Sequence, residues 1–419
     1  MWRSSQFLEL SRDGWLLLAT CGVRSFAYGF LSVILGLYLA ALGLGAGAIG
    51  GIFTAALAGG AVMTVFLTSV ADRVGRRRML IGGALLMALA ATVFALTDNW
   101  IWLTVAAILG TISPSGKEVG PFLSLEQAIL PQTTSDERRT STFAIYNLVG
   151  SVAGALGALA VGWPSVFGLE PLPGYRLLVW AYAVVSLLLL ILFAALSPAV
   201  EATAVTPLPR RHGLGVHRSR KVVAKLALLF AIDAFAGGFV VQSLVAYWFF
   251  LRYGVETQVL GPIFFGTNLF SALSFLVAVP IARRIGLLNT MVFTHLPSNV
   301  LLILVPFMPS LKLAVVVLFA RHLLSQLDVP TRQSYTMAVV DPDERSAAAG
   351  ITSVARNAAA ALAPAFTGAV LSVPSLGLPF VLAGGLKIIY DLTIFTLFRH
   401  VRPPEEMART SGVIALTPR

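Results

Sequence analysis

The chain has 419 residues, of which 57% are hydrophobic and only 12% are charged. A soluble domain is about 45–50% apolar and about 25% charged, and the apolar residues here come in runs of about twenty, long enough to cross a bilayer as helices. This composition excludes a soluble globular protein, so the net charge of +11 indicates membrane topology rather than nucleic-acid binding. The single cysteine, Cys21, excludes an internal disulfide and a cysteine-based metal site.

The apolar runs predict twelve transmembrane helices in an all-α integral membrane protein. Their expected ranges are 14–41, 47–70, 77–97, 100–131, 141–163, 175–197, 222–251, 257–281, 287–309, 312–340, 344–371 and 378–398. Each run can cross about 30 Å of hydrocarbon as a helix. The first run follows a short polar start without a convincing cleavage site, so we expect it to be retained as a helix.

A long polar segment, residues 198–221, leaves six expected helices on each side. It predicts a first domain at 1–197, a second domain at 222–402 and a tail at 403–419. Basic residues concentrate in this segment and in the loops expected on the same side, and basic loops face the cytoplasm. We therefore expect a multi-pass protein of the plasma (inner) membrane, with both termini in the cytoplasm.

The two halves share short sequence matches in the same order. The matched pairs are 23–30 with 232–239, 70–75 with 281–286, and 136–138 with 343–345. The first match aligns Arg24 with Asp233. Such a parallel duplication is typical of transporters that work by alternating access. It predicts two pseudo-symmetric six-helix bundles.

The loop between the second and third expected helices is densely charged. With the twelve helices and the repeat, it resembles the loop of the major facilitator superfamily, whose signature is Gly-x-x-x-Asp-Arg-x-Gly-Arg-Arg/Lys. The chain matches at Asp72, Arg73, Gly75, Arg76 and Arg77 and departs at the first position, where Thr68 replaces glycine. The resemblance implies the fold of that family and a gate in which Asp72 faces the cytoplasmic end of span 11. The alternative is that these arginines only set topology. Arg76 could also pair with Asp136 or Glu137.

A second family signature, Gly-x-x-x-Gly-Pro in span 5, is associated with antiporters. Span 5 has Gly150, Gly154 and Gly157 but lacks the proline. The missing proline weakens the hypothesis that the protein is an antiporter. The small residues are explained by close helix packing.

Ionisable groups deep in a membrane are costly and are therefore candidates for function. The candidate cavity residues are Arg24, Lys117, Glu118, Asp233, Arg321, Asp328, Arg356 and Asn357. Most lie on spans 1, 4, 7 and 10, which the resemblance places around a central cavity. Glu118 is a candidate proton carrier, with Asp233 and Asp328 as rivals.

Arg24 and Asp233 occupy equivalent positions in the repeats and have opposite charges. One hypothesis is an ion pair between the two halves; the alternative is that each has separate partners within its own half. Glu126 and Arg332 lie nearer the ends of their spans, and we expect them to close the gate or meet lipid headgroups.

The sequence contains no recognisable catalytic, nucleotide or metal-binding motif. It predicts a transporter that is not an enzyme, that needs no cofactor and that uses a proton gradient. We expect a monomer in the lipid bilayer, with a small-molecule substrate and without nucleic acid. Proton-coupled export of a small organic solute is slightly favoured over uptake of an organic anion or nutrient. A membrane receptor or enzyme that transports nothing is a remote alternative.

Overall fold

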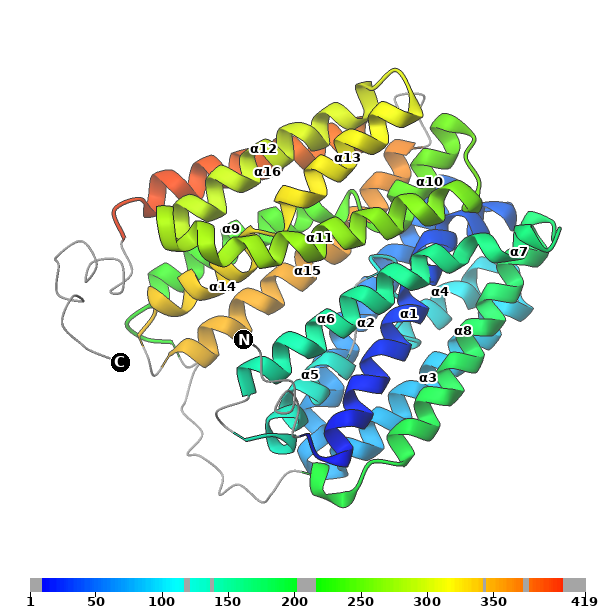
Figure 1. Ribbon diagram of the computed structural model, residues 1–419, viewed down its shortest axis with the longest axis horizontal. Helices are drawn as coiled ribbons and strands as arrows, with labels where there is room; N and C mark the ends of the chain where they lie inside the picture. Colours follow the sequence, from blue (N-terminus) through cyan, green and yellow to red (C-terminus); the bar gives the residue numbers. More distant parts are fainter. Residues whose placement is uncertain are drawn as a thin grey trace, which may run out of the picture. The chain divides into compact units, whose positions relative to one another are not determined.

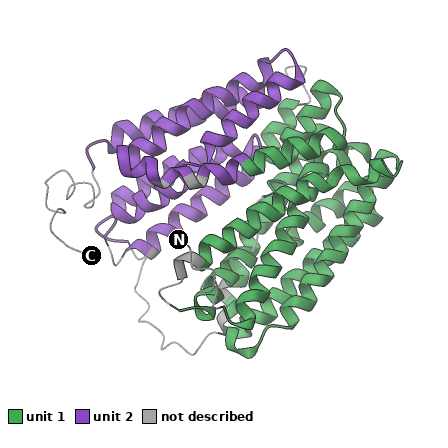
Figure 2. Ribbon diagram, viewed as in Figure 1, with its two compact units in different colours: residues 1–208, 241–269, 364–376 green, residues 209–240, 270–363, 377–419 purple. Residues whose placement is uncertain are grey.

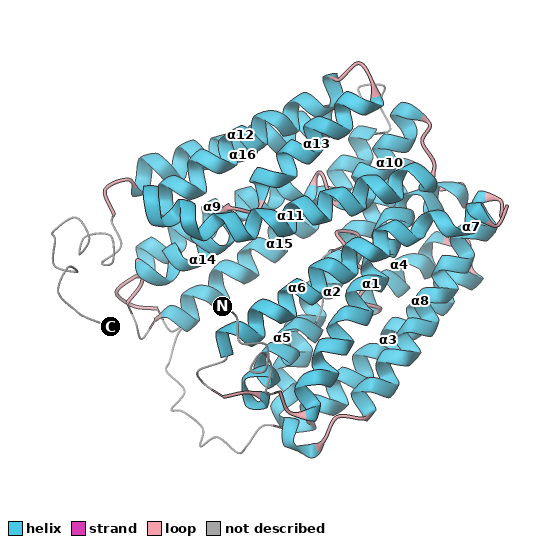
Figure 3. Ribbon diagram, viewed as in Figure 1, coloured by secondary structure: helices cyan, strands magenta, loops and turns pink. Residues whose placement is uncertain are grey.

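The computed structural model describes residues 10–116, 121–135, 139–201, 216–341, 344–371 and 377–401. Every regular element in these residues is a helix (Figure 3). The chain packs into two compact units (Figure 2). Unit 1 consists of residues 1–208, 241–269 and 364–376, and unit 2 of residues 209–240, 270–363 and 377–419. The division into a first and a second six-helix domain around residues 198–221 stays a prediction.

Unit 1 contains the helices of the first half of the chain and parts of the second (Figure 1). Its elements are α1 (Arg12–Ala41), α2 (Ala46–Val74), α3 (Arg76–Leu96), α4 (Trp100–Leu109), α5 (Pro121–Ile129), η1 (Leu130–Thr133), α6 (Arg139–Leu159), η3 (Ala160–Gly162), α7 (Trp163–Val166), α8 (Pro171–Ala194), η4 (Pro198–Val200) and α10 (Gln242–Tyr253). The first part of α11 (Thr257–Ile285) and the end of α15 (Arg345–Leu371) also belong to it.

Unit 2 contains the remaining helices of the second half. They are α9 (Arg220–Gly238), α12 (Leu287–Leu304), η5 (Val305–Phe307), α13 (Leu311–Ser325), α14 (Asp328–Ala338) and α16 (Leu378–Phe398), with the rest of α11 and α15. Its core lies where α9, α12 and α16 meet, with Phe230, Met291, Tyr390 and Ile394 buried together.

Each of the twelve expected spans corresponds to one helix or to a broken pair. The broken pairs are α4 with α5, α9 with α10, and α13 with α14. Within the described residues, ten helices are long and apolar enough to cross a membrane. The expected all-α membrane fold is therefore confirmed. Helices suit this setting because they satisfy their backbone hydrogen bonds internally, where no water is present.

Glycine allows α1 and α6 to pack in direct backbone contact. A Cβ added at Gly157 would lie 2.0 Å from the carbonyl oxygen of Phe26, and one added at Gly29 would lie 2.1 Å from that of Gly154. Small residues are the usual means of close approach between membrane helices. The packing role expected for the glycines of span 5 is therefore confirmed at Gly154 and Gly157.

A one-residue turn of the same kind joins α2 to α3 and α11 to α12. Gly75 has φ 109° and Gly286 has φ 89°, and each is the only residue between its two helices. Positive φ is easily adopted only by glycine. These residues are equivalent in the sequence repeat, so both copies of the loop make the same sharp turn.

The residues on both sides of the segment 202–215 are held by hydrogen bonds to a carboxylate, that of Glu201 before the segment and that of Glu344 after it. Glu201 accepts hydrogen bonds from the backbone N–H groups of Arg76 (2.6 Å) and Arg77 (3.4 Å) at the start of α3. Glu344 accepts hydrogen bonds from three successive N–H groups, those of His217 (2.7 Å), Arg218 (2.9 Å) and Ser219 (2.9 Å), ahead of α9. A carboxylate at a helix N-terminus satisfies unpaired donors and complements the helix dipole.

Candidate functional site

A buried ion pair joins α1 to α5 in unit 1. Arg24 donates from Nη1 to Oε1 of Glu126 at 2.8 Å and from Nη2 to Oε2 at 2.7 Å, and neither side chain is exposed. Thr20 and Tyr146 each donate a hydroxyl hydrogen bond to the same carboxylate. Phe122 places its ring centroid 4.9 Å from the guanidinium carbon. Such complete hydrogen bonding is what allows a charge pair to remain buried.

The burial of Glu126 differs from the contact with lipid headgroups that the sequence analysis allowed, and its role in closing the gate stays a prediction. Glu126 is fully buried and bound to the deep residue Arg24. The reason is geometric, because side chains lean toward the N-terminus of their helix. Spans 1 and 4 run in opposite directions, so Arg24 leans toward the end of the bundle and Glu126 leans into it.

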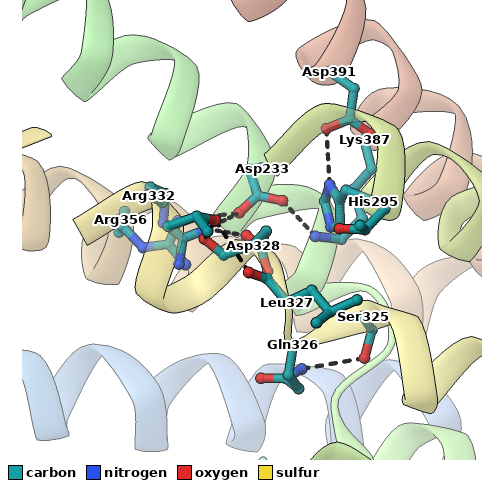
Figure 4. A network of polar contacts seen from close by, with 12 residues as sticks. Asp233, His295, Ser325, Gln326, Leu327, Asp328, Arg332, Arg356, Lys387 and Asp391 are labelled. Carbon is teal, nitrogen blue, oxygen red and sulfur yellow. Dashed lines mark hydrogen bonds and ion pairs between the residues drawn. The ribbon is translucent and has the colours of Figure 1, made fainter. Parts of the chain in front are cut away.

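Asp233 of α9 is the centre of a larger buried network in unit 2 (Figure 4). Its Oδ2 accepts hydrogen bonds from Arg332 of α14 at 3.3 Å and from Arg356 of α15 at 3.0 Å, and its Oδ1 accepts one from Lys387 of α16 at 2.5 Å. Arg332 also donates to Asp328, one turn earlier in α14, at 2.6 Å. Three positive and two negative charges therefore meet within unit 2.

Arg332 likewise differs from the expected contact with headgroups, and its role in closing the gate stays a prediction. Its side chain is only 9% exposed and it bridges Asp233 and Asp328. Arg356 is the most exposed member of the network, at 28% of its side chain. A guanidinium beside an excess of positive charge is suited to binding a carboxylate or a phosphate.

A second buried group of side chains lies beside this network. His295 of α12 has its Nδ1 2.8 Å from Oδ1 of Asp391 on α16. Asn299, one turn after His295, donates from Nδ2 to Oδ2 of Asp391 at 2.8 Å. Tyr390 packs edge-on against the imidazole, with ring centroids 6.2 Å apart. Asp391 is one turn from Lys387 on α16, which connects the two groups (Figure 4).

His295, Lys387 and Asp391 were not among the predicted residues. The sequence analysis followed the spans expected to line a cavity, and these three lie on spans 9 and 12. A usable signal was present, because Lys387 and Asp391 form an i, i+4 pair of opposite charges within an apolar run. Ionisable residues in such a run are candidates whichever helix carries them.

The other predicted cavity residues are distributed as follows. Arg321 of α13 donates from Nη1 to Nε2 of the adjacent His322 at 3.1 Å, and Nδ1 of that ring lies 2.9 Å from Ser271 Oγ. Asn357 is exposed on α15. Lys117 and Glu118 lie outside the described residues.

The partners of Arg24 and Asp233 lie within their own halves of the chain. Arg24 of span 1 binds Glu126 of span 4, and Asp233 of span 7 binds Arg332 of span 10. The structure therefore has the separate partners that were the alternative to a pair between the halves. The two ion pairs join equivalent spans of the repeat with their charges exchanged.

The predicted gate loop is described in part. Arg73 and Arg78 are exposed. Arg77 donates to the carbonyl of Ala194, and Arg76 donates to that of Ala128 at 3.5 Å. The backbone of Asp72 belongs to α2, but its side chain and residues 136–138 lie outside the described set. The gating contact of Asp72 and the pairing of Arg76 with Asp136 or Glu137 stay predictions.

The chain is similar to several known proteins. The sequence profile described as Major Facilitator Superfamily matches residues 17–325. The uncharacterized membrane protein YJR124C of Saccharomyces cerevisiae is 29% identical over 430 residues, covering 94% of this chain and 96% of that protein. The multidrug resistance protein MdtL of Shewanella oneidensis is 30% identical over 185 residues, covering 42% of this chain and 44% of its own. The crystal structure of the nucleoside transporter NupG superposes with a TM-score of 0.73 at 13% identity, covering 93% of this chain and all of that one.

Proposed function

Because this chain belongs to the major facilitator superfamily, and is therefore a multi-pass membrane transporter of a small solute rather than an enzyme, we propose that it exports a small organic solute by proton-coupled alternating access. The observation that carries this proposal is the set of buried charges on the spanning helices. Glu126 has no exposed side chain and Asp233 is 3% exposed. Charges buried at this depth are costly unless they are paired, so their pairing can be linked to a change of conformation.

The broken helices support a central binding site. Spans 4 and 10 are equivalent in the repeat, and each is interrupted, between α4 and α5 and between α13 and α14. Interrupted segments at corresponding positions of two halves are a good indicator of where a transporter binds its substrate. In span 10, Asp328 is the first residue of α14, directly after the break that follows α13, and it pairs with Arg332.

Export is favoured by the name of one relative, a multidrug resistance protein. A second candidate, proton-coupled uptake of an organic anion, is favoured by the network around Asp233. Its three cations exceed its two carboxylates, and Arg356 is partly exposed. The expected consequence is that Arg356→Gln weakens transport of an anionic solute about tenfold, the change that corresponds to about 1.4 kcal/mol, and leaves a cationic solute unaffected.

The setting of the transporter is part of the same proposal. The basic loops and the linker face the cytoplasm, as do both termini, in a plasma membrane. The protein acts as a monomer and takes its energy from the proton gradient without a bound cofactor. Asp72, Gly75 and the neighbouring arginines form the cytoplasmic gate.

The proposal is tested with purified protein in liposomes. Fluorescein, a small organic anion, and ethidium, a small organic cation, serve as fluorescent probes in both transport directions, with and without a pH gradient. We expect one probe to exchange faster than in protein-free liposomes and to accumulate only when the gradient is present. Exchange that ignores the gradient contradicts proton coupling. Accumulation of fluorescein on the side from which protons leave favours export, and accumulation on the side that protons enter favours uptake.

Arg356→Gln is measured beside Lys312→Gln. Lys312 is a cation near the start of α13 that is outside the network.

A further inference from the structure

We infer that His295, together with Asp391, is the group in unit 2 that binds and releases the coupled proton, an inference that rests on the proposed proton coupling. Both side chains are buried, His295 at 4% and Asp391 at 1% exposure. They lie on spans 9 and 12, beside the network around Asp233, which Lys387 of span 12 joins. An imidazole is the side chain whose unperturbed titration falls between pH 5 and 8.

The hydrogen bonds around His295 suit two protonation states. When Nδ1 carries a proton, it donates to Oδ1 of Asp391 at 2.8 Å. When Nδ1 carries none, it can accept from Nδ2 of Asn299, which lies 3.2 Å away, and Oδ1 of Asp391 then carries the proton between the two atoms or moves away from the ring. The same amide group donates to the other oxygen of Asp391 at 2.8 Å, and an amide nitrogen has two protons to give. Neither state therefore leaves Nδ1 without a partner, which makes a change of protonation possible inside a buried site.

The other acids of the two networks are held by permanent cations. Asp233 contacts Arg332, Arg356 and Lys387, and Asp328 contacts Arg332. In unit 1, Glu126 receives two hydrogen bonds from Arg24. A guanidinium does not give up its proton in proteins. Among the described acids of these networks, Asp391 is the one that contacts an imidazole, a partner able to change its own charge.

Charge couples this pair to the network. The titratable and charged groups around His295 include Asp391, Lys387 and Tyr390 of α16 and Asp233 of α9. Asp328 and Arg332 of α14 and Arg321 of α13 lie on helices that pack against α12. With His295 neutral, the three carboxylates of Asp233, Asp328 and Asp391 are set against the four cations of Arg321, Arg332, Arg356 and Lys387, a net charge of +1. A proton on His295 adds a positive charge to this buried set. Lys387, one turn from Asp391 and 2.5 Å from Asp233, transmits that change to the network.

The first test measures the protonation of His295 directly and needs no substrate. The chain has five histidines, so the variant His212→Gln/His217→Gln/His322→Gln/His400→Gln retains His295 alone. Full-length protein labelled with ¹³C at histidine Cε1 is placed in lipid nanodiscs and followed by NMR from pH 5 to 9. We expect the His295 signal to titrate in this range and its midpoint to shift by at least one pH unit in Asp391→Asn. A signal that does not change between pH 5 and 9 overturns the inference.

The second test connects this titration to transport. His295→Gln and Asp391→Asn are measured in liposomes with the probe that the wild-type protein moves, beside His322→Gln as a matched histidine variant of the same unit. We expect at least a tenfold loss of accumulation driven by a pH gradient in the first two variants, while exchange without a gradient stays measurable. His322→Gln keeps gradient-driven accumulation. Gradient-driven accumulation that survives in His295→Gln overturns the inference. Wild-type exchange that ignores the gradient instead contradicts the proposed proton coupling, and the NMR result is unaffected by it.

Discussion

Each half of the chain buries an ion pair between equivalent spans, and the two pairs have opposite polarity. The first span supplies the cation Arg24 and the seventh supplies the anion Asp233, while Glu126 and Arg332 provide the opposite charges from spans 4 and 10. Because each charge is buried, each partner depends on the other for its stability in the bundle.

The buried pair in unit 1 should be far more sensitive than an exposed one. Glu126→Gln removes the counter-charge of Arg24, and we expect it to lower the free energy of unfolding by about 3–5 kcal/mol, the usual cost of an unpaired buried charge. Replacing both residues with methionine should cost less than Glu126→Gln alone. SDS titration followed by tryptophan fluorescence measures both changes.

Arg176 and Asp98 supply the matched control. Their ion pair has the same 2.7 Å separation, but the side chains are 38% and 60% exposed. Arg176→Gln should therefore change stability by less than about 1 kcal/mol. Equal losses for Glu126→Gln and Arg176→Gln would show that burial does not govern the strength of the pair.

At the scale of elements, the contact between α1 and α6 depends on glycine. Because a Cβ at Gly157 would lie 2.0 Å from a backbone oxygen, Gly157→Ala must push the two helices apart. We expect a loss of about 1–3 kcal/mol in unfolding free energy, as for overpacked cores. Gly82→Ala in α3 is the control, because no atom lies within 4 Å of the added Cβ. Equal stability of the two variants in SDS titration would contradict this packing.

The link between α9 and α15 should depend on pH through Glu344. Burial of Glu344 raises the pKa of its carboxyl, but hydrogen bonds from the N–H groups of His217, Ser219 and Arg218 outweigh this effect and lower the pKa from its ordinary value of 4.5 to about 2. A carboxyl with a lower pKa in the folded chain stabilises the fold above the unfolded value. That stabilisation disappears as the pH falls from 4.5 to about 2.

Glu344→Gln should therefore lower the melting temperature at pH 7, because the amide offers the three N–H donors a weaker acceptor than the carboxylate. The difference from the wild type should shrink as the pH falls toward 2. Melting in detergent from pH 2 to 7 measures this, beside Glu256→Gln, which changes an exposed residue. A difference between Glu344→Gln and the wild type that does not depend on pH would mean that the carboxylate charge is unimportant there.

At the scale of the whole molecule, the sequence was sufficient for the helices and insufficient for the partners. Runs of apolar residues mark the spans because hydrocarbon imposes both their length and their composition. Arg24 and Asp233 were recognisable as deep charges for the same reason. The burial of Glu126 and Arg332 was missed because the direction in which a side chain leans decides where its charged group lies. His295 was missed because the candidates were concentrated on the helices expected to line the cavity.

Contacts between the two repeats make a prediction about transport. Gln242 of α10 donates to Ser32 of α1 at 2.9 Å, and Ser243 donates to the backbone oxygen of Ser32 at 2.6 Å. These contacts lie within unit 1 but join the first repeat to the second. In alternating access, the two repeats must separate at one end of the molecule in one of the two states. The contact between α1 and α10 should therefore break once in every transport cycle.

A reversible cross-link between α1 and α10 should stop transport. In a Cys21→Ala background, we expect Ser32→Cys/Gln242→Cys to lose transport when oxidised and to recover it with a reductant, because the bond prevents the helices from parting. Asp98→Cys/Arg176→Cys is the control, since it joins two residues of one repeat that are paired in the structure. Full transport by the oxidised Ser32→Cys/Gln242→Cys protein, with cross-linking verified by mass spectrometry, would mean that α1 and α10 move as one body. Helix α10 would then move with the other helices of unit 1 and not with the second repeat.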